Sequence, residues 1–114
     1  MISYQTVTIA DSASLSSAKE LPFGGVLVGV IARTGWTTAG VSFQVSVDGT
    51  TYYVLLDPAG AEYTIPAVVA ARYVALDPTM FMGVKYVKVQ SGTSASTTAQ
   101  SGGDTVDLVF RQVH

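Results

Sequence analysis

The sequence predicts an all-β fold, an antiparallel β-sandwich or jelly roll of about eight strands. Residues 41–47 alternate strictly between apolar and polar side chains, which is the period of a half-buried strand. Asp48 and Gly49 then give a turn signal before a second β-rich run, so the chain doubles back as a hairpin. Short strands recur between further turn signals, and no apolar period of about 3.6 residues persists long enough for a substantial helix.

The elements follow in order from these local patterns. Residues 2–9 are rich in β-forming side chains, and residues 24–32 form an apolar run that suits a central strand covered on both faces. Asp-Pro pairs at 57–58 and 77–78 open turns. The predicted strands span residues 2–9, 14–18, 26–32, the hairpin 41–56, 62–65 up to Pro66, 72–76, 84–90 and 105–113, with one helical turn at 79–82.

A chain of 114 residues is long enough for one domain with a single core, residues 1–114, and too short for two. The in-phase apolar positions of three strands predict this core: Val41, Phe43, Val45, Val87, Val89, Val106, Leu108 and Phe110. Residues 91–103 contain only small and polar side chains. Because such a segment has nothing to bury, we expect a loop that is mobile in the isolated protein and ordered only against a neighbour.

Composition excludes several classes of function. Only 12% of the residues are charged and the net charge is −2, so no basic surface for nucleic acid is expected. There is no cysteine, which excludes disulfides, thiolate metal sites and cysteine nucleophiles. The N-terminal residues lack the pattern of a signal peptide, and the longest apolar run, Gly24 to Ala32, is too short to span a bilayer as a helix.

The candidates for catalysis are few. His114 is the only histidine and the last residue, where fraying is expected, so neither a Ser-His-Asp site nor a transition-metal site is predicted. Paired carboxylates would be needed for glycosidase chemistry. The available acids are Asp11, Glu20, Asp48, Asp57, Glu62, Asp77, Asp104 and Asp107. Asp48, Asp57 and Asp77 sit beside glycine or proline, where turn capping explains them. We therefore expect no enzyme, no cofactor and no metal.

Aromatic and aliphatic residues supply the candidate binding sites. Trp36, in a loop, has two interpretations: a platform for a sugar ring, or a cap on the end of the core. The return strand of the hairpin places Tyr52, Val54 and Leu56 on one side and apolar residues on the other side too. A sandwich strand needs only one apolar face. The surplus apolar side is therefore covered either by a loop or by another subunit. The side with Tyr52, Val54 and Leu56 is the predicted interface.

Two stretches resemble parts of galactose-binding-domain-like sandwiches, the discoidin family in particular. Residues 43–52 are similar to its hairpin, in which a strand ends in Ser-x-Asp-Gly-Thr before an aromatic residue. Residues 84–89 are similar to a later strand of basic residue, tyrosine and alternating aliphatics. The sugar-binding loops of that family have no counterpart in this sequence. The resemblance implies the alternative function, a carbohydrate-binding module.

Most of the chain resembles small virion structural proteins of tailed bacteriophages. The likeness comprises the Trp-Thr-x-Ala loop at 36–39, the Ser-x-Asp-Gly-Thr turn at 46–50, and the segments 72–78 and 85–93. It implies a capsid decoration, cement or fibre protein that is assembled in the host cytoplasm and then binds the major capsid protein on the virion surface. It also implies a homo-oligomer. A trimer is expected, because trimers fit the threefold positions of an icosahedral shell.

Overall fold

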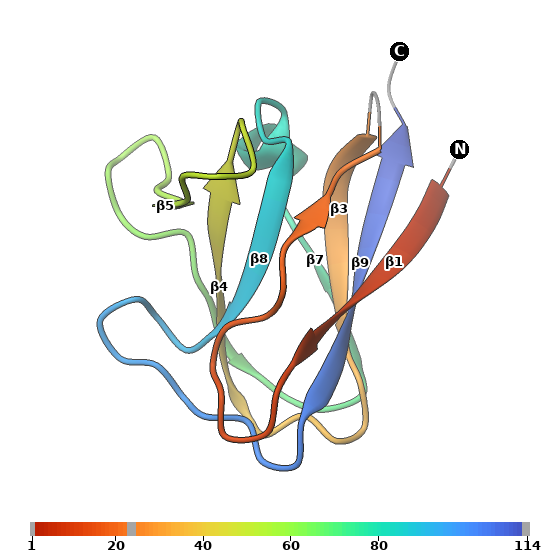
Figure 1. Cartoon of the computed structure of the whole chain (residues 1–114), viewed down its shortest axis with the longest axis vertical. Helices are drawn as coiled ribbons and strands as arrows, with labels where there is room; N and C mark the ends of the chain where they lie inside the picture. Colours follow the sequence, from red (N-terminus) through yellow and green to blue (C-terminus); the bar gives the residue numbers. More distant parts are fainter. Residues whose placement is uncertain (1, 23–24, 113–114) are drawn as a thin grey trace.

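The computed structural model describes residues 2–22 and 25–112, which form two antiparallel sheets packed face to face (Figure 1). The strands, in chain order, are β1 (Ile2–Ile9), β2 (Lys19–Glu20), β3 (Gly25–Ala32), β4 (Ala39–Ser46), β5 (Tyr53–Val54), β6 (Ile65–Val68), β7 (Arg72–Ala75), β8 (Tyr86–Ser91) and β9 (Asp104–Gln112). A 3-10 turn, η1 (Pro78–Phe81), lies between β7 and β8. No helix among the described residues is long and apolar enough to cross a bilayer.

The strand order identifies a jelly roll. Sheet 1 has the order β1-β9-β3-β7, and sheet 2 has the order β2-β8-β4-β5, with β6 also paired to β4. β5 and β6 both pair with the same edge of β4. β5 pairs with Gln44 and Val45, and β6 pairs with Ala39 and Val41, so the two short strands together occupy one strand position in the sheet. The chain then alternates between the sheets through the two Greek keys of a jelly roll. The predicted fold class is confirmed.

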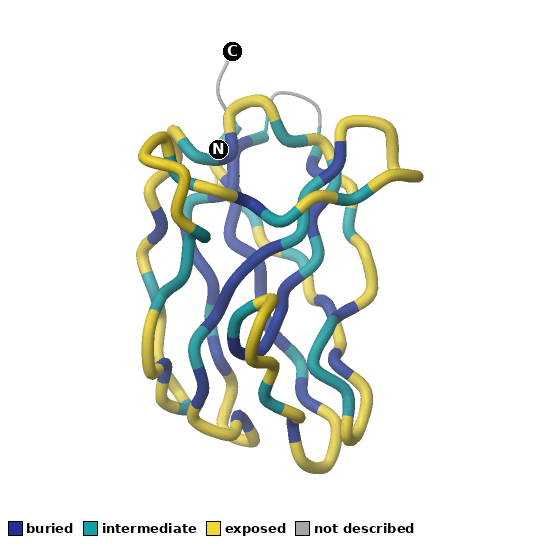
Figure 2. Tube along the Cα trace, turned by 90° about the vertical axis from the view of Figure 1, so that its left-hand side faces the viewer, coloured by how far each residue is buried: buried dark blue, intermediate teal, exposed yellow. Residues whose placement is uncertain are grey.

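The core lies between the two sheets, where Figure 2 shows buried segments running along the inner strands. Seven of the eight predicted core residues are buried, and Val45 is half-buried and packs against them. Phe43 also meets Phe81 of η1 edge to face, with ring centroids 5.2 Å apart. β3 lies between β9 and β7, as expected of a central strand. Alternation along the strands therefore predicts the inner faces correctly.

The strand predicted at residues 14–18 is wrong. This segment forms only an isolated bridge between Leu15 and Gln90, and the second strand is β2. Ser16 explains the difference, because its hydroxyl accepts a hydrogen bond from the backbone N–H of Val89 at 2.9 Å. A side chain thus takes the place of one backbone rung, as serine often does outside regular structure.

The strand predicted to stop before Pro66 is also wrong, because β6 contains this proline. β6 is an edge strand, and its one partner is β4. Proline is tolerated on an edge strand where its missing N–H would have faced away from the sheet. The return arm of the hairpin is shorter than expected as well, since only Tyr53 and Val54 form strand.

The predicted loop at 91–103 is partly built into the sandwich. Ser91 belongs to β8, and Gln100 is fully buried, so the expectation that this segment buries nothing is wrong at that residue. The amide of Gln100 accepts from the N–H of Thr37 at 2.8 Å, and donates to the Thr37 carbonyl at 3.0 Å and the Ser91 hydroxyl at 2.8 Å. Mobility stays a prediction for the residues between these two anchors.

Candidate functional site

The predicted interface residues lie at the β5 edge of sheet 2. Val54 is in register with Gln44 of β4 and is half-buried. Leu56, beyond the end of the strand, is exposed and bridges to Glu62 across the following turn. At this edge Val54 is therefore partly covered by the chain itself, whereas Leu56 is open to solvent. Its role as an interface stays a prediction.

Tyr52, the third residue of that set, lies beneath a lysine. The Nζ of Lys88 is 4.4 Å from the centroid of the tyrosine ring, a cation–π contact. Partial burial raises the pKa of the Tyr52 phenol above its ordinary value, with smaller contributions from Tyr86 and Asp48. The phenol is therefore uncharged at neutral pH, and this residue offers a packing surface and a hydroxyl rather than a proton-transfer group.

The opposite side of the return strand divides into two environments. Leu55 is buried in the core, and its N–H donates to the carbonyl of Phe43 at 3.1 Å. Tyr53 is 63% exposed. On this side of the return strand, Leu55 therefore belongs to the core, whereas the ring of Tyr53 is exposed to solvent.

The outer face of sheet 2 is polar, yet several of its side chains are buried. Ser42 and Gln90 are in register on β4 and β8, and both are buried. The Ser42 hydroxyl lies 2.7 Å from the carbonyl oxygen of Gly92 and 3.2 Å from Oε1 of Gln90. Connections from outside the sheet thus cover part of this face and are joined to it by hydrogen bonds.

The hairpin turn at one end of this face is organised by Asp48. Its Oδ1 accepts from the N–H groups of Thr50 at 2.8 Å and Thr51 at 3.0 Å, and from the Ser46 hydroxyl at 3.0 Å. These bonds, the backbone ones first, lower the pKa of the carboxyl below its ordinary value. Gly49 adopts φ +80°, a conformation that suits glycine. The interpretation of Asp48 as a turn residue is confirmed.

Sequence reasoning misses a second exposed surface, the outer face of sheet 1. Tyr4 of β1, Val109 of β9 and Gly29 of β3 stand in one row across it. Tyr73 of β7 lies over Gly29 so closely that a Cβ there would clash with its hydroxyl. Ile2, Tyr4 and Tyr73 are all more than half exposed. Alternation along each strand was visible in the sequence, but not which outer face the connections would leave bare.

One ion pair crosses this apolar face. Arg33 meets Asp107 with both ends of its guanidinium, Nε to Oδ2 at 3.1 Å and Nη2 to Oδ1 at 2.6 Å. Asp107 raises the pKa of the guanidinium through this hydrogen bond and through its charge, with a small contribution from Tyr4. The paired geometry holds both side chains in place on this face, where Asp107 is in register with Thr6 and Ile31.

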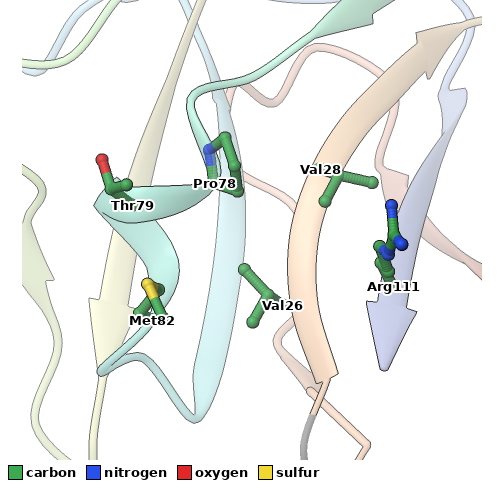
Figure 3. Close-up of a pocket in the computed structure, with 6 residues that line it drawn as sticks. All are labelled: Val26, Val28, Pro78, Thr79, Met82 and Arg111. Carbon is green, nitrogen blue, oxygen red and sulfur yellow. The ribbon is translucent and has the colours of Figure 1, made fainter. Parts of the chain in front are cut away.

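A shallow apolar pocket of about 270 Å³ opens between β3 and η1 (Figure 3). Its lining consists of Val26, Val28, Pro78, Thr79, Met82 and Arg111. Pockets that enclose small molecules usually have about 300–1,000 Å³ and several convergent polar groups. This one is smaller and has one charged side chain at its rim, so its size and lining do not indicate a catalytic site.

The remaining acidic residues are mostly engaged with nearby groups. Four of them accept hydrogen bonds from backbone N–H groups: Asp57 from Ala59 and Ala61, Asp77 from Thr79, Asp11 from Gly102, and Glu62 from Ser94. Glu20 forms an ion pair with the ammonium of Lys85. Asp104 is buried, and its Oδ2 has no hydrogen-bond partner in the described chain. Within residues 2–22 and 25–112, no cluster of His, Cys, Asp and Glu could hold a metal ion. His114 lies outside the described residues.

Trp36 caps the core. It is 4% exposed, and its Nε1–H donates to the carbonyl of Val68 at 3.1 Å. A buried indole with a satisfied N–H is the usual structural use of tryptophan. The alternative interpretation, an exposed platform for a sugar, is wrong for this residue.

Comparison with known proteins adds a structural likeness. The chain is similar to the SPBc2 prophage-derived protein YomS, with a TM-score of 0.55 and 12% sequence identity over 96% of this chain and 94% of that one. At this identity the likeness shows a shared fold. No protein family model and no curated protein matches the chain.

Proposed function

We propose that the protein is a non-enzymatic structural component of a phage particle. In this proposal it binds the outer surface of the capsid through the major capsid protein and stabilises or decorates the shell. It assembles in the host cytoplasm as a homo-oligomer, with a trimer expected at threefold positions. The residues proposed to contribute are those of the bare outer face of sheet 1 and the β5 edge.

The shared fold supports a phage origin. The likeness to a prophage-derived protein extends over nearly the whole of both chains, so it concerns the complete jelly roll and not one motif. The resemblance of the sequence to small virion proteins agrees with it. Jelly rolls are frequent among viral capsid domains.

The single observation that carries the proposal is the exposed apolar surface of sheet 1. Large contiguous apolar patches are rare on monomeric soluble proteins and usually mark a contact with another molecule. Ile2, Tyr4 and Tyr73 contribute to this surface from three positions on two strands. The Arg33–Asp107 ion pair on this face would enter such a contact with its charges already paired.

Co-sedimentation tests the proposal. The purified protein would be mixed with capsids that lack it, taken from the phage whose virion genes neighbour this reading frame. We expect saturable binding, weakened at least tenfold by Tyr73→Lys and little changed by Thr38→Lys, a substitution at an exposed loop residue. No pelleting with capsids at high micromolar concentration would overturn the proposal. Binding to a glycan array without capsid binding would instead support the carbohydrate-binding alternative.

A further inference from the structure

The four edges of the two sheets differ in how they are protected. β2 consists of two charged residues, β5 has two residues, β6 contains a proline and β7 has four residues beginning with arginine. Short length, charge and proline are the features that prevent an edge strand from pairing with another chain. β1 has none of them, since its eight residues include no charge and no proline.

Backbone groups of β1 point outward from this unprotected edge. The carbonyl of Thr8 accepts from the N–H of Ser17 at 3.3 Å, so it faces away from β9. In an antiparallel ladder every second residue faces the same way, which directs the backbone groups of Thr6, Tyr4 and Ile2 outward too. Within the described chain, no backbone hydrogen bond covers these three residues on that edge. The segment from Ile2 to Thr6 is therefore open for pairing.

The side chains of this segment are self-complementary. Ile2 and Tyr4 are 67% and 65% exposed on the outer face, and Ser3 and Gln5 are half-buried on the other face. When two such strands meet in antiparallel orientation with Tyr4 opposite Tyr4, the two tyrosine rings lie side by side on the outer face. Ile2 then lies beside Thr6, and polar Ser3 lies beside polar Gln5 on the other face. No like charges are brought together, because the strand carries none.

We propose that β1 is a self-association site, at which it pairs antiparallel with β1 of a second copy about a twofold axis at Tyr4. Ile2 would pair with Thr6 of the partner subunit, Tyr4 with Tyr4 of the partner subunit, and the first sheets of the two copies would become continuous. The contact is isologous and closes upon itself. It specifies the self-association that the proposed function includes, and rests on that part of it.

The size of the contact sets its strength. Stable interfaces bury roughly 800 Å² per partner. Pairing of about five backbone residues with two exposed side chains provides less, although it adds about six hydrogen bonds. We therefore expect a dimer that dissociates on dilution. A trimer formed elsewhere on the surface would be joined by this contact into a hexamer.

Cysteine crosslinking tests the register directly, because the chain has no cysteine. Paired residues that exchange hydrogen bonds have Cα atoms about 5.5 Å apart, within the range of a disulfide. Under mild oxidation, Tyr4→Cys should give a covalent dimer on a non-reducing gel. The matched control is Thr38→Cys, at an exposed loop residue outside both the β1 edge and the β5 edge. Equal crosslinking of both variants, or none of Tyr4→Cys, would overturn the proposal.

Sedimentation analysis tests the interaction without a covalent bond. Tyr4→Lys places two positive charges at the twofold axis, and Thr6→Pro removes an outward N–H without removing a bond to β9. Each should weaken self-association at least tenfold while the melting temperature stays close to that of the wild type. Thr38→Lys, at an exposed loop residue, is the control. A wild-type protein that is monomeric at high micromolar concentration, or an oligomer unchanged by both β1 variants, would contradict the β1 contact. Capsid binding that persisted in that case would leave the proposed function standing.

Discussion

The two outer faces of the sandwich have opposite character. On sheet 2, Ser42 and Gln90 are polar but buried, and the Ser42 hydroxyl lies within hydrogen-bond distance of the Gly92 carbonyl, in the connection after β8, and of Oε1 of Gln90. On sheet 1, Ile2, Tyr4 and Tyr73 are large and mostly apolar but exposed. Figure 1 shows the same asymmetry in the connections, since the long loops after β5 and β8 extend on the side of sheet 2 and away from β1.

This difference shows that the connections of a small jelly roll decide which of its two outer faces stays exposed. Both sheets supply apolar residues to one core, so their inner faces are alike in character. The loops then cover one outer face only, and the other is left with side chains that water solvates poorly. Substitutions in the two sheets should reveal this division.

The largest effects are expected on the inner faces, where the two sheets should behave alike. Phe43→Ala in β4 and Phe110→Ala in β9 each remove a fully buried ring, at an expected cost of about 3–5 kcal/mol. Urea denaturation followed by tryptophan fluorescence measures both. An unchanged midpoint for either variant would mean that its ring is not part of a shared core.

A smaller effect should separate the outer faces. Ser42→Ala leaves the buried carbonyl of Gly92 without its hydroxyl partner, and should cost about 1–3 kcal/mol. Thr6→Val removes an exposed hydroxyl from the outer face of sheet 1 and should change stability by less than about 0.5 kcal/mol. The same denaturation experiment compares them. Equal losses would show that the outer face of sheet 2 is no more closely covered than that of sheet 1.

The smallest effect concerns acid and the hairpin turn of sheet 2. The folded-state pKa of Asp48 is lowered by its hydrogen bonds, so its contribution is present above the unfolded pKa of about 3.9 and is lost as pH falls below it. The difference in melting temperature between the wild type and Asp48→Asn should therefore shrink between neutral pH and about pH 3. A carboxyl carbon resonance of Asp48 that titrates above pH 4 would contradict this.

The sequence predicts the inner architecture well, because burial on one side of a strand leaves a period that can be read directly. Val41 and Phe43 are in phase in the sequence and together in the core. The jelly roll itself follows from many short strands and no helix. These features depend on local patterns, which sequence alone contains.

The outer surface is less predictable, because it depends on where the connections lie. Leu55 and Tyr53 were expected together on the side of the return strand opposite Tyr52, but Leu55 is buried in the core while Tyr53 stays exposed. Gln100 reads as one polar residue among many, and only the meeting of two distant segments gives its amide three partners. Nothing in residues 2–9 indicates that their strand forms an edge.

The position of β9 between β1 and β3 has a consequence for synthesis. Sheet 2 consists of strands that have all been made once Ser91 leaves the ribosome. Sheet 1 cannot close until residues 104–112 emerge, because β1 and β3 have no ladder with each other among the described strands. Until then, the buried side chains of β1 and β3 are exposed, and closing the sheet requires contacts between residues about a hundred positions apart, which slows folding. This interval is when the nascent protein is most exposed to aggregation and most dependent on molecular chaperones.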